Sequence, residues 1–315
     1  MVSALALVTG GLGFIGSHVV RALVAEGTPV RVLDNGSTGS RENLAGVERS
    51  VEVVEGDIRN AVACSSACRG VDVVYHLAAY ISVPGSIQDP ILSDAVNIGG
   101  TLNVLMAAHR ARVRRVVFSS SAAVYGDTEV VPAHENLPPA PLSPYGVGKA
   151  YGEMMCRVFD VLHGLETVSL RYFNVYGPRQ NPRSEYAAVV PRFASMLLAG
   201  ETPTIFGDGE QTRDFLFVED VARANLLAAR VPEARRHVIN IGGGVRTSVN
   251  QLHAVLREVV GRGGDPIHGP ERPGDIRHSG ADIRRAQALL GFAPSVSLHE
   301  GLARTVAFLR QVPRA

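Results

Sequence analysis

One stretch of the chain has residue types and a spacing that could move a proton: the heptapeptide Ser-Pro-Tyr-Gly-Val-Gly-Lys from Ser143 to Lys149. Ser followed by Pro is typical of a helix start, because Ser caps free N–H groups and Pro suits the first helical position. Tyr145 and Lys149 then lie four residues apart on one helix face. An ammonium group near a phenol favours the ionised form, so the pair predicts a tyrosine base.

To act as a base at neutral pH, Tyr145 needs a pKa well below that of a free tyrosine. A free tyrosine titrates near 10, so a base at neutral pH needs a shift of about 3 units, or about 4 kcal/mol. A nearby Lys could supply part of this shift and a bound cationic cofactor the rest.

Lys149 is the only lysine among the 31 Lys and Arg residues of the 315-residue chain. Arg is planar and always charged, whereas Lys is a compact point charge whose pKa adjusts to its surroundings. A chain that uses Arg at every other basic position indicates that position 149 needs an ammonium group. The alternative is chance, because Tyr-x-x-x-Lys occurs in many helices, so the neighbouring motifs must support the pair.

A glycine-rich turn near the N-terminus predicts a dinucleotide site. The apolar residues 4–8 predict a buried strand, and Gly10, Gly13 and Gly16 follow it at the start of a helix predicted to end near Glu26. Glycine permits a tight turn and close approach to a pyrophosphate, which the N-terminus of the helix attracts. The strand before and the helix after make this a strong motif.

Acidic residues follow two of the next predicted strands. Asp34 ends a strand at 30–33 and could accept both hydroxyls of an adenosine ribose while repelling a 2′-phosphate, which favours NAD over NADP. Asp57 follows a strand at 51–55 and suits an adenine contact. For both residues the alternative is a structural one, a loop cap for Asp34 and a helix cap for Asp57.

Further strands are predicted at 71–75, 115–119, 167–173 and 237–241, with a helix over 98–110. Alternation of strands and helices predicts an α/β fold with a doubly wound parallel sheet. After Asn174, prolines and glycines predict irregular segments, and short helices are expected from about Thr247. We therefore expect a cofactor domain of residues 1–173 plus about 217–242, and a smaller substrate domain of residues 174–216 and 243–315.

The composition is that of a globular protein, with 46% hydrophobic and 19% charged residues. A formal net charge of +1 argues against a nucleic-acid or membrane surface. The apolar run at 4–8 is too short for a signal sequence or a membrane span. Three cysteines, without metal-site spacing, predict neither a disulfide framework nor a metal site. We expect a cytoplasmic protein.

Together these motifs resemble the extended short-chain dehydrogenase/reductase family, which has a Rossmann fold, and within it the NAD-dependent nucleotide-sugar epimerases. Similarity is greatest to UDP-hexose and UDP-N-acetylhexosamine 4-epimerases. The resemblance covers essentially the whole chain, and it rests on Thr9 to Gly16, Asp34-Asn35, Gly56-Asp57-Ile58, Ser119 to Gly126, Tyr145-x-x-x-Lys149, Arg171 to Pro178 and Arg213-Asp214-Phe215.

The resemblance implies tightly bound NAD and catalysis by Ser121, Tyr145 and Lys149. Tyr145 would take the proton of the sugar 4-hydroxyl, Ser121 would align that hydroxyl, and Lys149 would lower the Tyr pKa and hold the nicotinamide ribose. The implied cofactor contacts are Gly10, Gly13, Phe14, Ile15, Gly16, Asp34, Asn35, Ser37, Thr38, Gly39, Asp57, Ile58, Leu77, Ala78, Ala79, Asn97, Ser119, Tyr145, Lys149 and Tyr172.

The resemblance also implies a UDP-sugar substrate and a homodimer. Arg213 and Arg272 would bind the diphosphate, for which the guanidinium fork is suited. The implied substrate contacts are Ser82, Ser121, Asn174, Ala188, Val189, Thr204, Phe206, Arg213, Arg272, Asp275 and Ser279. Dimer contacts are expected from the helices near 98–110 and 146–163, and the apolar residues expected on the second helix are Met154, Met155, Val158, Phe159 and Leu162.

Several functions remain open within this family. Its 4,6-dehydratases and glucuronate decarboxylases carry acidic residues in the turn before Val-Tyr-Gly, where this chain has Ala122 and Ala123. The missing carboxylate favours 4-epimerisation. The sugar remains open between glucose, N-acetylglucosamine and glucuronate, although the small Ser279 predicts room for an acetamido group. An NAD-sensing scaffold would not need Ser121, Tyr145 and Lys149 together.

Overall fold

The computed structural model describes residues 4–181, 188–271 and 276–311. Seven strands form a parallel sheet in the order β10-β6-β5-β4-β1-β2-β3. They are β1 (Leu5–Thr9), β2 (Val30–Asp34), β3 (Val51–Glu55), β4 (Val71–His76), β5 (Arg115–Ser121), β6 (Glu166–Tyr172) and β10 (Val238–Ile241). The α/β fold with a doubly wound parallel sheet is confirmed, and each of these strands was predicted with ends close to those observed.

The strand order reverses between β1 and β4. The chain runs from β1 outward through β2 to β3 and then returns to β4 on the other side of β1. In open parallel sheets a ligand crevice forms at such a switch point, outside the carboxyl ends of the strands. Thr9 and His76 are the last residues of these two strands and pair with one another.

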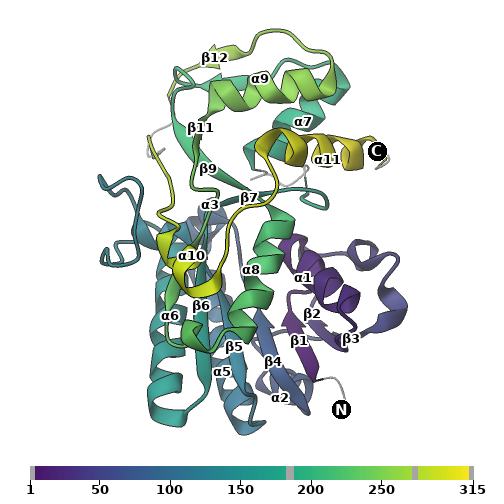
Figure 1. Ribbon diagram of the computed structural model, residues 1–315, viewed down its shortest axis with the longest axis vertical. Coiled ribbons are helices and arrows are strands. Elements are labelled where there is room, and N and C mark those ends of the chain that lie inside the picture. The colour runs from purple at the N-terminus through teal and green to yellow at the C-terminus, as the bar shows by residue number, and fades with distance from the viewer. Residues whose placement is uncertain (1–3, 182–187, 272–275, 312–315) are drawn as a thin grey trace.

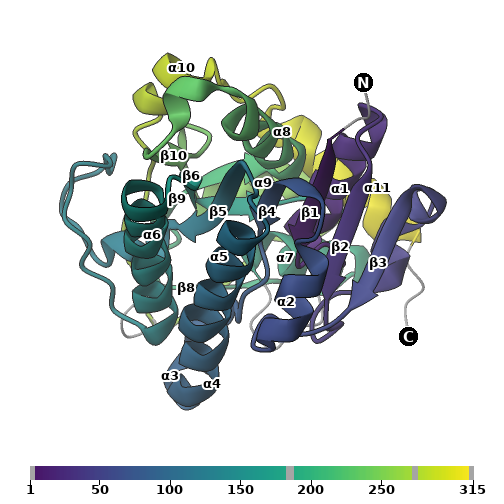
Figure 2. The same ribbon diagram turned by 90° about the horizontal axis from the view of Figure 1, so that it is seen from below.

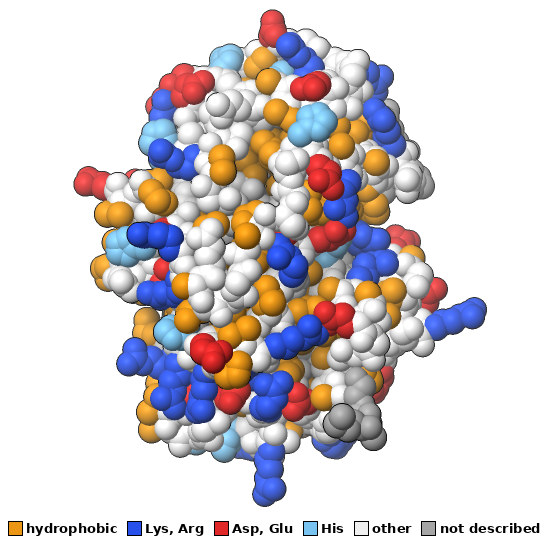
Figure 3. All heavy atoms as spheres, in the orientation of Figure 1, with side chains coloured by type: hydrophobic (Ala, Val, Ile, Leu, Met, Phe, Trp, Pro, Cys, Tyr) orange, Lys and Arg blue, Asp and Glu red, His pale blue; other side chains and the backbone are white. Residues whose placement is uncertain are grey.

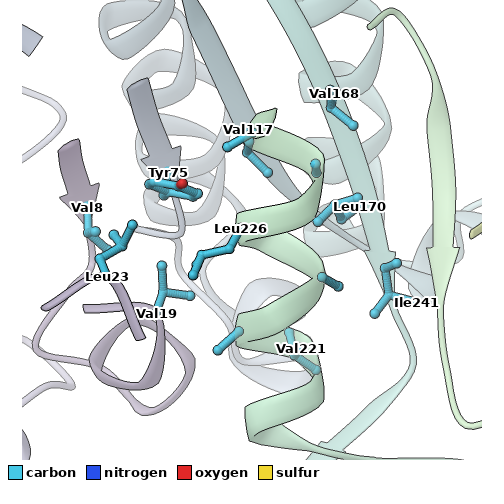
Figure 4. Close-up of a cluster of buried hydrophobic side chains, with 14 of the residues drawn as sticks. Val8, Val19, Leu23, Tyr75, Val117, Val168, Leu170, Val221, Leu226 and Ile241 are labelled. Carbon is cyan, nitrogen blue, oxygen red and sulfur yellow. The ribbon is translucent and has the colours of Figure 1, made fainter. Parts of the chain in front are cut away.

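Helices cover both faces of the sheet (Figure 2). One face carries α1 (Phe14–Ala25) and α8 (Val218–Arg230), and the other carries α2 (Ala61–Ala67), α5 (Thr101–Arg110) and α6 (Pro144–His163). Figure 4 shows Val221 and Leu226 of α8 between Val19 and the side chains of the sheet. The short helix α10 (Arg284–Leu290) adds Ala286, Leu290 and Phe292 to the same core. Short 3₁₀ turns lie at 41–44, 48–50, 122–125 and 232–234.

The helix predicted at 98–110 is longer than expected. The short helix α3 (Val83–Gln88) precedes it. The long helix then begins with α4 (Pro90–Asp94), continues through a π-helical segment (Ala95–Gly100) and ends with α5. Asp89 starts it by accepting a hydrogen bond from Leu92 N. Among the described helices, this segment alone has the length and composition of a membrane span. It is a core helix, because Val104 and Leu105 are buried in the cluster under the sheet.

A second, smaller lobe lies above the carboxyl ends of the strands (Figure 1). Its strands form a three-stranded sheet, β11-β9-β7, and a pair, β12-β8. The elements are β7 (Asn174–Tyr176), α7 (Val189–Ala199), β8 (Thr204–Phe206), β9 (Thr212–Phe217), β11 (Arg246–Ser248), α9 (Val249–Val260), β12 (Ile267–Gly269) and α11 (Leu298–Gln311). Phe193, Leu252 and Leu302 are in its core. The expectation of irregular structure after Asn174 was therefore wrong for the described residues, because strands this short show no alternation in sequence.

Charges of both signs are interspersed over the surface in Figure 3, which matches the near-zero net charge.

Candidate active site

The first turn of α6 places two candidate catalytic side chains against the end of β5. Ser143 Oγ accepts a hydrogen bond from Gly146 N, and Pro144 occupies the first turn, as the sequence predicted. A Cβ atom at Gly146 would lie 2.8 Å from Ala123 O, and one at Gly148 would lie 2.7 Å from Asn97 Cβ. The glycines therefore allow α6 to pack closely on the turn after β5 and on the π-helical segment.

Lys149 is buried, and its Nζ donates a 2.6 Å hydrogen bond to Ser119 O. The same Nζ lies 5.7 Å from the ring centroid of Tyr145 and 5.2 Å from that of Phe118. Burial lowers the pKa of Lys149 to about 8, and the Glu153 carboxylate opposes this fall. The ammonium group is thus held beside the phenol at a pKa close to neutrality.

Tyr145 is partly buried and forms a hydrogen bond with Ser121. Burial raises the pKa of the phenol, and the hydrogen bond from Ser121 opposes the rise. The lowering of the Tyr145 pKa expected from Lys149 is therefore absent, because burial has the largest effect on the phenol. The side chains of the protein bring base, hydroxyl and ammonium group together, but the shift to an ionised phenol needs a further positive charge.

The glycine-rich turn opens toward the switch point of the sheet. Gly10 has φ +72°, and a Cβ atom there would lie 2.7 Å from Ala78 N. A Cβ atom at Gly16 would lie 2.0 Å from Gly10 O, so only glycine fits. The helix α1 begins without a side-chain cap. Its first N–H groups are therefore available to an anion, and the turn fits a pyrophosphate.

Asp34 is the last residue of β2, and its carboxylate accepts hydrogen bonds from two backbone N–H groups. Its Oδ2 accepts from Leu12 N at 2.9 Å and its Oδ1 accepts from Gly36 N at 2.8 Å. Each carboxylate oxygen can accept a second hydrogen bond, so the loop-cap role and a ribose contact are compatible.

Asp57 accepts hydrogen bonds from Arg59 and from Asn35 Nδ2. The hydrogen bond from Arg59 lowers the pKa of Asp57 to about 2, against a small effect of burial. The helix-cap alternative for Asp57 was wrong, because the side chain of Asn60 caps α2.

Most other candidate cofactor residues surround the same edge of the sheet. Phe14 and Ile15 begin α1; Ser37, Thr38 and Gly39 follow β2; and Leu77, Ala78 and Ala79 follow β4. Ile58 and Tyr172 are buried, and Tyr172 Oη donates to Asn225 Oδ1. Asn97 is bonded to both backbone groups of Tyr80. Their contacts with a cofactor remain predictions.

Two adjoining cavities share Asn174 and Arg213; the first lies in the smaller lobe and the second lies where the two lobes meet. The first, of about 270 Å³, is lined by the candidates Asn174, Ala188, Val189, Thr204, Phe206 and Arg213. The second, of about 310 Å³, is lined by Ser121, Tyr172, Ser279 and the two shared residues. The two cavities thus adjoin at Asn174 and Arg213 and together reach from Ser121 to α7, whereas Tyr145 and Lys149 line neither of them.

One substrate candidate lies elsewhere and two are outside the described residues. Ser82 lines neither cavity, and its Oγ accepts from Gly85 N as the cap of α3. Arg272 and Asp275 fall in the segment that the structure does not describe. The lining residues that were not predicted include Arg192, Gln211 and His278. Gln211 is adjacent to the Arg213 motif and could have been included, whereas Arg192 and His278 carry no sequence motif.

Comparison with known proteins decides the family. Residues 6–242 match the NAD dependent epimerase/dehydratase family. The chain belongs to this family. A UDP-glucose 4-epimerase of Mycolicibacterium smegmatis is 43% identical over 96% of this chain and 98% of its own length. The cofactor is accordingly NAD.

Solved structures of the family superpose over nearly the whole chain. The UDP-glucose 4-epimerase of Thermotoga maritima with UDP-glucose is 42% identical, covers 98% of this chain and 99% of its own, and has a TM-score of 0.92. The UDP-N-acetylglucosamine 4-epimerase of Methanobrevibacter ruminantium with UDP-N-acetylmuramic acid is 40% identical, with the same coverage and a TM-score of 0.93.

Members with other activities are nearly as similar. A dTDP-glucose 4,6-dehydratase of Streptomyces griseus is 38% identical over 96% of this chain and 93% of its own length. A UDP-glucuronic acid decarboxylase of Xenopus tropicalis is 35% identical over 97% of this chain and 72% of its own. Family membership therefore establishes an NAD-dependent enzyme, and the reaction must be argued from the site.

Proposed function

We propose that this protein is an NAD-dependent UDP-sugar 4-epimerase. The observation that carries the proposal is the turn after β5, where Ala122 and Ala123 line the cavity next to Ser121. A dehydratase or decarboxylase needs a group that moves a proton at C5 of the sugar, and these two side chains can neither accept nor donate one. The catalytic groups that remain, Ser121 and Tyr145, suit proton transfer at a single hydroxyl.

In the proposed reaction Tyr145 accepts the proton of the sugar 4-hydroxyl. Ser121 shares a hydrogen bond with this phenol and aligns the same hydroxyl. NAD would supply the oxidation at C4 and the reduction that follows, so that the hydride lost from C4 returns to the other face of the sugar. Tyr145 then gives the proton back, while the protein holds the nucleotide and leaves the sugar free to turn.

The residues present fit NAD. The uncapped start of α1 and the close approach of Gly10 to Ala78 N leave space for a pyrophosphate, and Asp34 can accept ribose hydroxyls. A UDP-glucose 4-epimerase of Thermus thermophilus in complex with NAD is 39% identical, covers 98% of this chain and 100% of its own, and has a TM-score of 0.89. The cationic nicotinamide ring would contribute the further positive charge near Tyr145.

Asp34→Ala should weaken the retention of NAD and relax the rejection of NADP. The substitution removes the ribose acceptor, the negative charge and the link to Leu12 N. The measurement is the NAD content of the purified protein. Asp72→Ala, which removes an exposed ion pair with Arg114, is the control. Wild-type NAD content in Asp34→Ala would exclude this residue from the cofactor site.

The substrate side of the proposal rests on the two adjoining cavities. Arg213 lies where both cavities meet, so its guanidinium group suits the diphosphate, with the nucleoside in the cavity at α7 and the sugar beside Ser121. The same cavities could hold UDP-glucuronate, which is the alternative substrate. Incubation with UDP-glucose, UDP-N-acetylglucosamine and UDP-glucuronate, with separation of the products, tests the proposal. Failure to epimerise any of them would overturn it.

We expect UDP-N-acetylglucosamine to be epimerised at a rate comparable to that of UDP-glucose. The small side chain of Ser279 lines the sugar cavity, and its N–H is fixed to Thr212 O at 3.0 Å. Ser279→Tyr should abolish turnover of the N-acetylated sugar and spare that of UDP-glucose, because the added ring excludes the acetamido group. Ser279→Ala is the matched control. Loss of both activities in Ser279→Tyr would show that residue 279 is not the gate.

We also propose a homodimer. Val147, Met154, Val158, Val161 and Leu162 are exposed on one face of α6, and Ile91 is exposed on the adjoining α4. Such an apolar face favours a partner of the same kind. Phe159, expected on this face, is instead in the core. Light scattering at micromolar concentration should give twice the chain mass of 33.5 kDa, and a monomeric mass would exclude the dimer.

In this proposal each lobe contains a different part of the active site. The seven-stranded sheet carries the NAD site and the catalytic groups, and the smaller lobe carries the nucleotide cavity. The boundaries predicted from sequence, and a cytoplasmic location, are part of the proposal.

A further inference from the structure

Three consecutive residues at the end of β5 each interact with one residue on the same face of α6. Tyr145, Lys149 and Glu153 follow one another at intervals of four residues on the helix. Ser121 bonds to Tyr145, Ser119 O accepts from Lys149, and Ser120 Oγ donates to Glu153 Oε1. The first two pairs contain the catalytic groups, and the proposed mechanism gives the third pair no role.

Glu153 is also the centre of a buried ion pair. Arg171 of β6 donates to Oε1 from Nε at 2.8 Å and to Oε2 from Nη2 at 2.7 Å. The side chains of Arg171 and Glu153 are 3% and 6% exposed. The guanidinium carbon lies 4.5 Å from the ring centroid of Tyr125, which lines the sugar cavity. The pair thus joins α6, β5, β6 and the turn that carries Ala122 and Ala123.

Several titratable groups surround Lys149 and Glu153. His76 of β4 is bonded between Thr9 Oγ1 and Thr101 Oγ1, and burial together with Lys149 lowers its pKa to about 3, so it is neutral. Burial keeps three further groups in their protonated form: Tyr145 and Cys156 of α6 and Tyr172 of β6. Among these described groups Glu153 supplies the negative charge that acts on Lys149, and Arg171 is its ion-pair partner.

We propose that Glu153 is a positioning residue that, through Ser120 and Arg171, fixes the end of β5 and keeps the ammonium group of Lys149 charged beside Tyr145. The inference rests on the proposed role of Lys149. A carboxylate one turn beyond the lysine opposes the loss of its proton on burial. Its hydrogen bond to Ser120 holds the residues on either side, Ser119 and Ser121, against α6.

The single lysine allows a direct test that needs no substrate. Protein labelled with lysine carrying ¹³C at Cε gives one side-chain signal, whose shift with pH reports the titration of Lys149. We expect a midpoint near 8 in the wild type and a fall of about 1 unit in Glu153→Gln, a tenfold change in proton affinity. Glu52→Gln is the control, since Glu52 pairs with Arg31 at the surface.

Two further readouts separate positioning from a merely structural role. The alkaline limb of kcat should move to lower pH in Glu153→Gln with little change in KM, and Glu153→Asp, which keeps the charge, should restore more than half of the shift. If Glu153→Gln does not fold because Arg171 is left unpaired, Glu153→Gln/Arg171→Met removes both charges, and the midpoint should still fall. A midpoint within about 0.2 units of wild type would overturn the proposal.

The outcomes also distinguish this inference from the proposed function. A lowered lysine midpoint in a protein that epimerises no UDP-sugar would refute the epimerase and retain the role of Glu153. A wild-type midpoint for Lys149 in a Glu153→Gln enzyme that still epimerises a UDP-sugar would refute the role of Glu153 and retain the epimerase function.

Discussion

Tyr145→Phe should reduce the rate of 4-epimerisation by about 10²–10⁴-fold, the usual contribution of a general base. The substitution removes the phenol oxygen and the bond to Ser121 and leaves the ring beside Lys149 in place. NAD content and UDP binding should be retained, because Tyr145 is part of neither the Gly10 turn nor the lining of the cavity at α7. The measurement is kcat on the preferred UDP-sugar together with bound NAD.

Tyr151→Phe is the matched control, because Tyr151 is a partly buried tyrosine of the same helix that is not among the candidate site residues. It should keep wild-type activity within a factor of about 2, as expected for a substitution away from the site. A Tyr145→Phe enzyme within tenfold of wild type would mean that another group takes the proton.

Lys149→Arg should lose most activity although it keeps the positive charge, with a fall in kcat on the order of 10²-fold. The site holds a compact ammonium group, fixed by its hydrogen bond to Ser119 O and buried against the Phe118 ring. A planar guanidinium group is larger and does not titrate near neutrality, so it can neither occupy the same position nor adjust its charge.

The pH dependence of the two enzymes provides a second measurement. Burial lowers the pKa of Lys149 to about 8, so its ammonium group is charged below that pH and is lost as the pH rises through it. Wild-type kcat should therefore fall on the alkaline side, and Lys149→Arg should lack this limb. Arg157→Lys, an exposed change on the same helix, is the control. Near wild-type turnover in Lys149→Arg would refute the need for an ammonium group.

The larger lobe could be predicted from sequence because its strands are buried apolar runs bounded by functional turns. The strand before Gly10, the strand ending in Asp34 and the strand ending in Ser119 to Ser121 each carry both signals. The helix containing Tyr145 was predicted from its cap alone, since Ser143 and Pro144 specify where it starts. Local chemistry and the periodic pattern agree at these places.

The smaller lobe was expected as a separate domain, but its short strands were missed, and so were the contacts that fix the site. A strand as short as Thr204–Phe206 is too short to show a periodic pattern of apolar residues. It pairs with residues 267–269, which are distant in sequence, so the pairing is visible only in the folded structure. The direction of the Tyr145 pKa shift also depends on burial, which spacing does not reveal. The Glu153–Arg171 pair joins residues of separate elements. Arg171 falls in a predicted strand and motif, but nothing in the sequence pairs it with Glu153.

The most direct test of the account is the fate of hydrogen at C4 and C5 of the sugar. The wild-type enzyme is incubated in D₂O with UDP-glucose and with UDP-N-acetylglucosamine, both unlabelled, and the products are examined by NMR. The account predicts C4 epimers that keep the original hydrogen at C4 and take up no deuterium at C5, because the hydride leaves and returns within the site and no group moves the C5 proton. Deuterium at C5, or a product that has lost its C6 oxygen, would contradict it.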